Sequence, residues 1–201
     1  MGLLDQLFRK AAHELANDVK QNAKQNINTA INTKTETFVF QSLPQTLEEL
    51  KALPEADLKS PFKAAALTVL ALNMYPTNRE ACFEMMEFLN GPDDLSNLDK
   101  SKINDRFMDG RSYVARSYFE GATPENNYAP KMPYTIKVIQ SAHSNDTLNE
   151  GYVTLYIQSG GADGPRNVRL RTKPSTGQWF VNQFEGLLAS IRIPKAEDKW
   201  A

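Results

Sequence analysis

The chain has 201 residues, a formal net charge of −1 and a hydrophobic share of 41%. This length suits a single domain with a core of its own. The near-zero charge excludes a global electrostatic field that would attract nucleic acid or acidic membranes, so we expect no nucleic acid partner.

Residues that bind metals or form disulfides are scarce. Cys82 is the single cysteine, which excludes an internal disulfide, and His13 and His143 are the two histidines. A zinc site built from cysteine and histidine needs more ligands than these, so we expect neither a metal nor a cofactor. The chain contains no run of about 18 apolar residues and no basic segment followed by an apolar leader. We therefore expect a cytoplasmic protein without a transmembrane segment.

Residues 3–32 are predicted to form one amphipathic helix, because apolar side chains recur at helical spacing. They are Leu4, Leu7, Phe8, Ala11, Ala12 and Leu15, continued more weakly by Val19, Ala23, Ile27 and Ile31. We divide the chain into this N-terminal helix or attachment, residues 1–34, and a single α+β domain, residues 35–201. The helix is expected to pack on its own domain or on a second copy, as a homo-oligomer or with a protein partner. Peripheral membrane contact is less favoured, because acidic residues offset its basic ones.

The first half of the domain is predicted to be mainly helical. A short strand is expected at residues 35–40, followed by a helix that Thr46 and Glu49 cap and that ends before Pro54. Ser60 and Pro61 open a buried central helix that ends at residue 75. Further helices are expected from Asn78 to residue 90 and near residues 98–108.

The second half is predicted to be mainly extended. Residues 112–119 are expected to be extended, and residues 120–133, with three prolines, form a long loop. Strands are predicted at residues 134–139, 151–159, 168–172 and 179–184, joined by short turns. The predicted fold class is therefore α+β, with a helical N-terminal two-thirds packed on a C-terminal antiparallel β-meander.

The glycine-rich segment Ser159 to Arg166 is the most conspicuous loop. It lies between two strands and lacks the Gly-Lys-Ser/Thr ending of a phosphate-binding loop. We therefore interpret it as a hairpin turn whose glycines supply positive φ angles. Asp163 and Arg166 could pair across this turn.

Basic and aromatic side chains alternate on the two predicted strands beside this turn. Arg169, Arg171 and Lys173 share one face of their strand, and Tyr152 and Tyr156 share one face of the preceding strand. Such a face could contact phosphates or stack bases. The solvated outer face of a half-buried sheet is the favoured interpretation.

Two isolated reactive residues are interpreted as structural. His143 lies in a turn between strands, where no partner for general base catalysis is evident, and is expected to be exposed to solvent. Cys82 lies within a helical apolar stripe and is expected to be buried as a small hydrophobic residue.

Residues from about 40 to 201 resemble a family of bacterial proteins, mostly from gut organisms, with no assigned function. The resemblance implies a fold unit and a bacterial setting, and no catalytic residues. It is carried by Leu43 to Pro54, Ser60 to Ala65, Phe88 to Pro92, Asp105 to Met108, Ser117 to Tyr128, Ser159 to Asp163 and Ile191 to Pro194.

No nucleophile, metal or nucleotide motif is recognisable, so we expect a non-enzymatic binding or assembly module in which the N-terminal helix mediates association. The alternative is a small-ligand-binding or hydrolase-like protein with a pocket between the sheet and the central helix. The candidate ligand-binding residues of that pocket are Tyr118, Glu120, Asp163 and Arg166. No catalytic residue is assigned.

Overall fold

The computed structural model describes residues 33–200 and, in addition, Asn17. Apart from Asn17, the predicted helix at residues 3–32 therefore lies outside the described residues, as does His13. The described helices are α2 (Leu47–Lys51), α3 (Pro61–Met74), α4 (Arg79–Asn90), α5 (Asn97–Phe107) and α6 (Tyr113–Arg116). The strands are β1 (Lys34–Phe40), β2 (Tyr134–Gln140), β3 (Tyr152–Ile157), β4 (Arg166–Lys173) and β5 (Gln178–Gln183).

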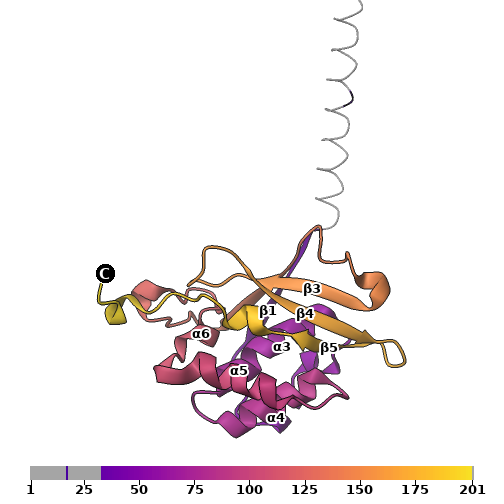
Figure 1. The fold of residues 1–201 in the computed structure, drawn as a ribbon, viewed down its shortest axis with the longest axis horizontal. Coiled ribbons are helices and arrows are strands. Elements are labelled where there is room, and N and C mark those ends of the chain that lie inside the picture. The colour runs from indigo at the N-terminus through magenta and orange to yellow at the C-terminus, as the bar shows by residue number, and fades with distance from the viewer. Residues whose placement is uncertain (1–16, 18–32, 201) are drawn as a thin grey trace, which may run out of the picture.

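The five strands form one antiparallel sheet in the order β1-β2-β3-β4-β5 (Figure 1). The mixed α+β class is confirmed, but the arrangement differs from helices followed by sheet. Strand β1 precedes the helices and pairs with β2 along its whole length, from Lys34 opposite Gln140 to Phe40 opposite Tyr134. Pairing with β2 places Phe38 and Phe40 in the core, where they are at most 8% exposed.

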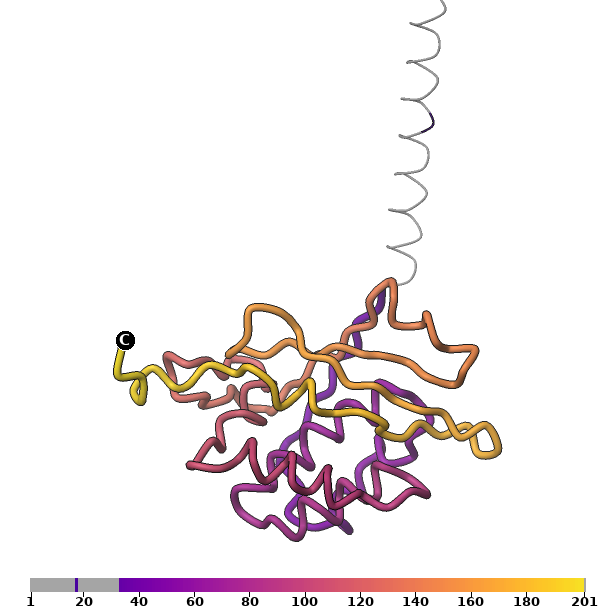
Figure 2. Tube along the Cα trace, viewed as in Figure 1, coloured from indigo at the N-terminus to yellow at the C-terminus, as the bar shows by residue number. Residues whose placement is uncertain are grey.

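Alternation along the strands separates a buried inner face from an outer face. The predicted apolar stripe of β3 is confirmed, because Val153, Leu155 and Ile157 are all buried. In β4, Val168 and Leu170 are buried while Arg171 is exposed. Side chains point alternately to opposite faces of a strand, so each strand has one buried face. The helices cover that face, because α3 contacts β2 to β5. Figure 2 shows the helical segments on one side of the sheet.

Helix α3 lies at the centre of the domain. Ser60 accepts a hydrogen bond from the backbone N–H of Phe62 at 3.3 Å, and Pro61 occupies the first turn, as predicted. Every residue from Ala64 to Leu72 is at most 1% exposed, because α3 contacts β2 to β5 on one side and α4 on another. The described side chains of α3 are therefore buried on the side that faces the sheet, where the alternative function predicts a pocket.

Side-chain N-caps fix the starts of the outer helices, and of the two only Asn78 was predicted from the sequence. Asn78 caps α4 by accepting a hydrogen bond from Ala81 N–H at 3.1 Å, and Ser96 caps α5 through Asp99 N–H at 3.1 Å. Gly91 ends α4 with a φ of 84°. Its Cα faces the ring of Phe180 in β5, and a Cβ there would lie 2.6 Å from that ring. A glycine at this position therefore allows α4 to end against the sheet.

The prediction of an extended segment at residues 112–119 is wrong. Residues Tyr113–Arg116 form α6, and Ser117 N–H donates to the carbonyl of Tyr113 at 3.0 Å. Three consecutive side chains, Tyr113, Val114 and Ala115, are buried. An extended strand would turn alternate side chains to opposite faces, so a helical turn places them in the core more effectively.

Candidate functional site: the outer sheet face and the groove beside β5

The outer sheet face is the side of the sheet turned away from the helices. The face extends about 20 Å along the strands and about 20 Å across them, as expected from five strands of this length. Its residues are Thr35, Thr37, Val39, Thr135, Lys137, Ile139, Tyr152, Thr154, Tyr156, Asn167, Arg169, Arg171, Lys173, Gln178, Phe180 and Gln183. Among these strand positions there is no carboxylate, whereas four carry a positive charge.

The charges of this face are largely unneutralised. Lys137 is 3.3 Å from the carboxylate of Glu120, and both side chains are half-exposed. Arg169, Arg171 and Lys173 form no salt bridge with any residue that the structure describes. Strand β4 therefore presents three cations in a row with period two, as the sequence predicted.

Aromatic rings lie among these cations. The guanidinium of Arg169 is 4.2 Å from the centre of the Tyr152 ring, and that of Arg171 is 5.8 Å from it. These are cation–π distances. In the strand register, Arg171 lies opposite Tyr152 of β3 and Phe180 of β5. The row combines apolar area with charge.

A groove of about 420 Å³ adjoins this face where β4 and β5 meet the end of α4. We call it the β5 groove. Its walls come from the segment joining α4 to α5, from the start of α5 and from the two strands. It is lined by Asn90, Pro92, Asp93, Asp99, Arg171, Thr172, Lys173, Pro174, Phe180, Val181 and Asn182.

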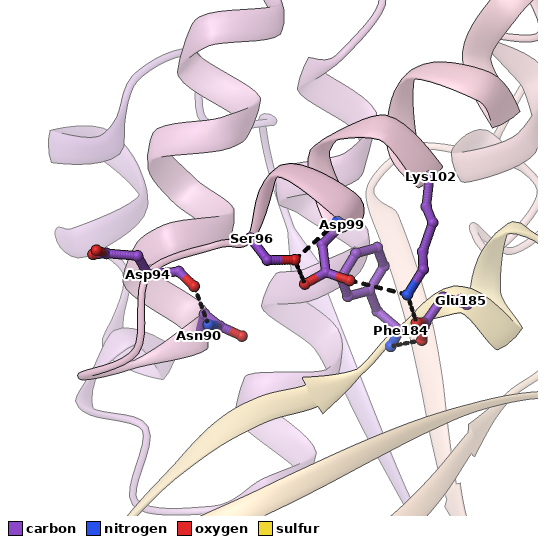
Figure 3. A network of polar contacts seen from close by, with 7 residues as sticks. All are labelled: Asn90, Asp94, Ser96, Asp99, Lys102, Phe184 and Glu185. Carbon is purple, nitrogen blue, oxygen red and sulfur yellow. Dashed lines mark hydrogen bonds and ion pairs between the residues drawn. The ribbon is translucent and has the colours of Figure 1, made fainter.

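A polar network holds α5 against the end of β5, next to the groove (Figure 3). Asp99 accepts hydrogen bonds from the Ser96 hydroxyl at 2.6 Å and from Lys102 Nζ at 3.1 Å. Lys102 also pairs with Glu185, just beyond β5. Burial acts to raise the pKa of Asp99, but the hydrogen bonds outweigh it and the net pKa lies below its usual value. Hydrogen bonds to Glu185 and Asp99 raise the pKa of Lys102.

Two of the predicted ligand-binding residues, Tyr118 and Glu120, line one hollow of about 220 Å³ together with Lys137. Tyr118 is 3% exposed, and its hydroxyl donates to the carbonyl of Leu187. Burial raises the pKa of this phenol well above its usual range. The Tyr118 hydroxyl is thus engaged in holding the fold, while the Glu120 carboxylate lies at the surface beside Lys137.

The other two predicted residues, Asp163 and Arg166, do not line that hollow. Asp163 has a side chain that is 97% exposed and lies 3.4 Å from Arg192. Arg166 donates to the carbonyls of Ala189 and Ser190, each at 2.9 Å. Instead of pairing across their turn, both side chains contact the C-terminal segment.

The glycine-rich turn has a different role from the one predicted. Gly160 and Gly161 have φ angles outside the left-handed region. They are required for close approach, because a Cβ on Gly160 would lie 1.9 Å from the carbonyl oxygen of Ala122. Gly160 N–H donates to the carbonyl of Ser117 at 2.8 Å, and the Ser159 and Ser117 hydroxyls are 2.8 Å apart.

The C-terminal segment completes this packing. The Arg192 N–H donates to the carbonyl of Gly161 at 2.9 Å, and the hydroxyl of Tyr128 donates to the carbonyl of Arg192 at 2.6 Å. Burial raises the pKa of Tyr128 to about 12. We call residues 117–128, 159–163 and 190–194 together the loop junction. Each of these segments, distant in sequence, contains residues that carry the family resemblance, and their contacts with one another hold the fold together.

The expectations for His143 and Cys82 are confirmed. His143 has an 85% exposed side chain, and its Nδ1 lies 3.2 Å from Asp146 in the same turn. Cys82 is fully buried, and burial raises the pKa of its thiol to about 12. Neither residue faces the β5 groove.

Sequence reasoning found the basic and tyrosine positions of the outer face but missed the β5 groove. The lining residues Asn90, Asp93 and Asn182 come from segments far apart in the chain, and no local pattern marks them. Phe180 could have been found, because strand alternation places it opposite the buried Val181.

Residues 33–200 contain no group of three potential metal ligands among histidine, cysteine and acidic side chains. No helix in the described part of the chain has the length and hydropathy needed to cross a membrane.

Most of the described domain is similar to one known protein family. A family model described as Domain of unknown function (DUF6935) matches residues 42–195. The match includes the helices, β2 to β5 and the β5 groove, and it confirms the resemblance to a family without an assigned function. Neither a curated protein nor a solved structure matches the chain.

Proposed function

Since the chain belongs to the family described as Domain of unknown function (DUF6935), we propose its function from its geometry: it is a non-enzymatic binding module whose outer sheet face binds an acidic surface of a partner protein. The observation that carries this proposal is the row of Arg169, Arg171 and Lys173, which have no salt-bridge partner among residues 33–200. Unpaired cations on a rigid strand are available for a partner at little ordering cost.

The composition of the face favours protein over nucleic acid. Tyrosine and arginine are enriched at protein interfaces, and here Tyr152, Tyr156 and Arg169 lie on one sheet. The β1 side of the same face adds uncharged side chains, including Val39, which is 52% exposed. With a chain net charge of −1, little long-range attraction to a phosphate backbone is expected.

The titratable groups near the expected pocket also support binding rather than catalysis. The hydroxyl of Tyr118 is committed to the backbone of Leu187. Glu120 and Asp163 contact different cations, Lys137 and Arg192, and of the two only Glu120 lines the hollow beside Tyr118. A pair of carboxylates acting on one bond would have to flank the same site.

Reversing the charge of β4 tests this function. The variant Arg169→Glu/Arg171→Glu is expected to bind a fluorescent poly-glutamate peptide about tenfold more weakly than the natural chain, with a weaker salt dependence. Fluorescence anisotropy measures both. The matched control is Lys195→Glu/Lys199→Glu, which changes the net charge equally but alters exposed residues of the C-terminal segment.

Three outcomes would count against the proposal. Equal weakening by both double variants would mean that net charge rather than this face governs binding. Absence of binding to poly-glutamate by the natural chain would exclude an acidic protein surface as the partner. Tighter binding of an oligothymidylate of equal charge would assign the face to nucleic acid instead.

For the N-terminal segment we propose association with a second copy. The support is the apolar stripe that begins with Leu4, Leu7 and Phe8. Light scattering on the full chain and on a chain starting at Thr33 is expected to give a dimer or larger species and a monomer, respectively. The start at Thr33 keeps β1 whole. The same number of protomers in the species formed by both chains would contradict this role.

A further inference from the structure

The β5 groove has opposite charges on two different walls. Asp93 comes from the segment joining α4 to α5, Arg171 and Lys173 come from β4, and all three side chains belong to residues that line the groove. None of these three side chains forms a salt bridge with any residue of the described range. The second acidic residue of the groove, Asp99, has both oxygens engaged by Ser96 and Lys102.

Between the charged walls the groove offers apolar area and amide groups. Phe180 is half-buried, and its ring is held in place by the close approach of Gly91. The amide of Asn90 donates to the carbonyls of Asp93 and Asp94 and so shapes the wall that carries the free carboxylate. The side chain of Asn182 makes no hydrogen bond within the described chain and is exposed at the groove.

The size of the groove restricts the ligand. Its volume of about 420 Å³ lies within the range of roughly 300–1,000 Å³ found for small-molecule sites. A molecule with one charge could satisfy one wall and would leave the opposite charge without a partner. A molecule with a cationic and an anionic end satisfies both walls and can place an apolar middle on Phe180.

We propose that the β5 groove binds a zwitterionic molecule of dipeptide size. Its ammonium group pairs with Asp93, its carboxylate pairs with Arg171 and Lys173, and its side chain packs on Phe180. This inference rests on a different observation from the proposed binding of an acidic protein, namely the acidic and apolar residues of the groove. The two sites share Arg171 and Lys173, but Asp93 belongs to the groove alone and Arg169 belongs to the outer sheet face alone.

Isothermal titration calorimetry on the full chain with glycyl-phenylalanine tests the proposal. The free dipeptide is expected to bind, and N-acetylation or C-terminal amidation, each of which removes one charge, is expected to weaken binding at least about tenfold. The variant Asp93→Asn is expected to weaken binding of the free dipeptide to a similar extent. It should change little for the N-acetylated form, which has already lost the ammonium group.

The matched control is Asp94→Asn, because Asp94 is the next residue, is equally exposed and does not line the groove. The outer-face variant Arg169→Glu should likewise leave dipeptide affinity unchanged. The proposal is overturned if the free dipeptide gives no binding, if blocking either end has no effect, or if Asp93→Asn and Asp94→Asn behave alike. If Arg169→Glu loses poly-glutamate binding and keeps dipeptide binding, this result supports a dipeptide site that is distinct from the outer sheet face.

Discussion

Replacement of Gly160 by alanine is expected to lower the free energy of unfolding by about 3 kcal/mol. The added Cβ would lie 1.9 Å from the carbonyl oxygen of Ala122 and 3.5 Å from Cα of Thr123. Both neighbours are backbone, so the methyl group cannot be accommodated by rotation of a side chain. The turn that contains Gly160 must move away from the loop that contains Ala122. This movement strains the hydrogen bond from Gly160 N–H to the Ser117 carbonyl.

Thermal unfolding measures this effect, and a fall of the melting temperature by roughly 10 °C is expected for a domain of this size. Gly164→Ala is the control in the same turn, because nothing lies within 4 Å of a Cβ at that position. Its stability should stay within about 0.5 kcal/mol of the natural chain. Equal melting temperatures for the two variants would show that the turn does not pack against the loop as described.

Truncation of Leu70 to alanine is the second change with a large expected effect. Leu70 lies in α3 and is fully buried, and α3 contacts four strands as well as α4. Its removal leaves a cavity between layers that are held in place on both sides, so the structure can relax only in part. Urea denaturation is expected to show a loss of about 3 kcal/mol.

Leu98→Ala is the matched control for this truncation. Leu98 also lies in a helix, α5, but it is 65% exposed. The same loss of side-chain atoms should therefore change stability by no more than about 0.5 kcal/mol. A similar loss in both variants would contradict the central position of α3.

Helix and strand positions were predictable where the signal is local. The N-caps Ser60 and Asn78 were identified from sequence, and both accept the expected backbone hydrogen bonds. Such caps work within one turn of chain, so neighbouring residues carry the whole signal. The outer positions of β3 and β4 were predictable for a similar reason, because strand alternation has a period of two.

The candidate site was predictable only in part. Arg169 and Tyr152 were placed on one face from alternation alone, and the structure brings them within 4.2 Å. The grouping of Tyr118 and Glu120 with Asp163 and Arg166 was based on loop composition, which carries no information on distance. The structure gives the two pairs different contacts.

The sequence by itself thus determined most of the helices and strands, which face of β3 and of β4 is buried, and that the outer face of β4 is basic. Only the tertiary structure decided that β1 pairs with β2, that residues 113–116 are helical, that Gly160 serves close packing, and that Asp93 and β4 line the same groove. The physical reason is the range of the interactions. Caps and alternation depend on neighbours in the chain, whereas pairing, close approach and opposed charges depend on how distant segments pack together.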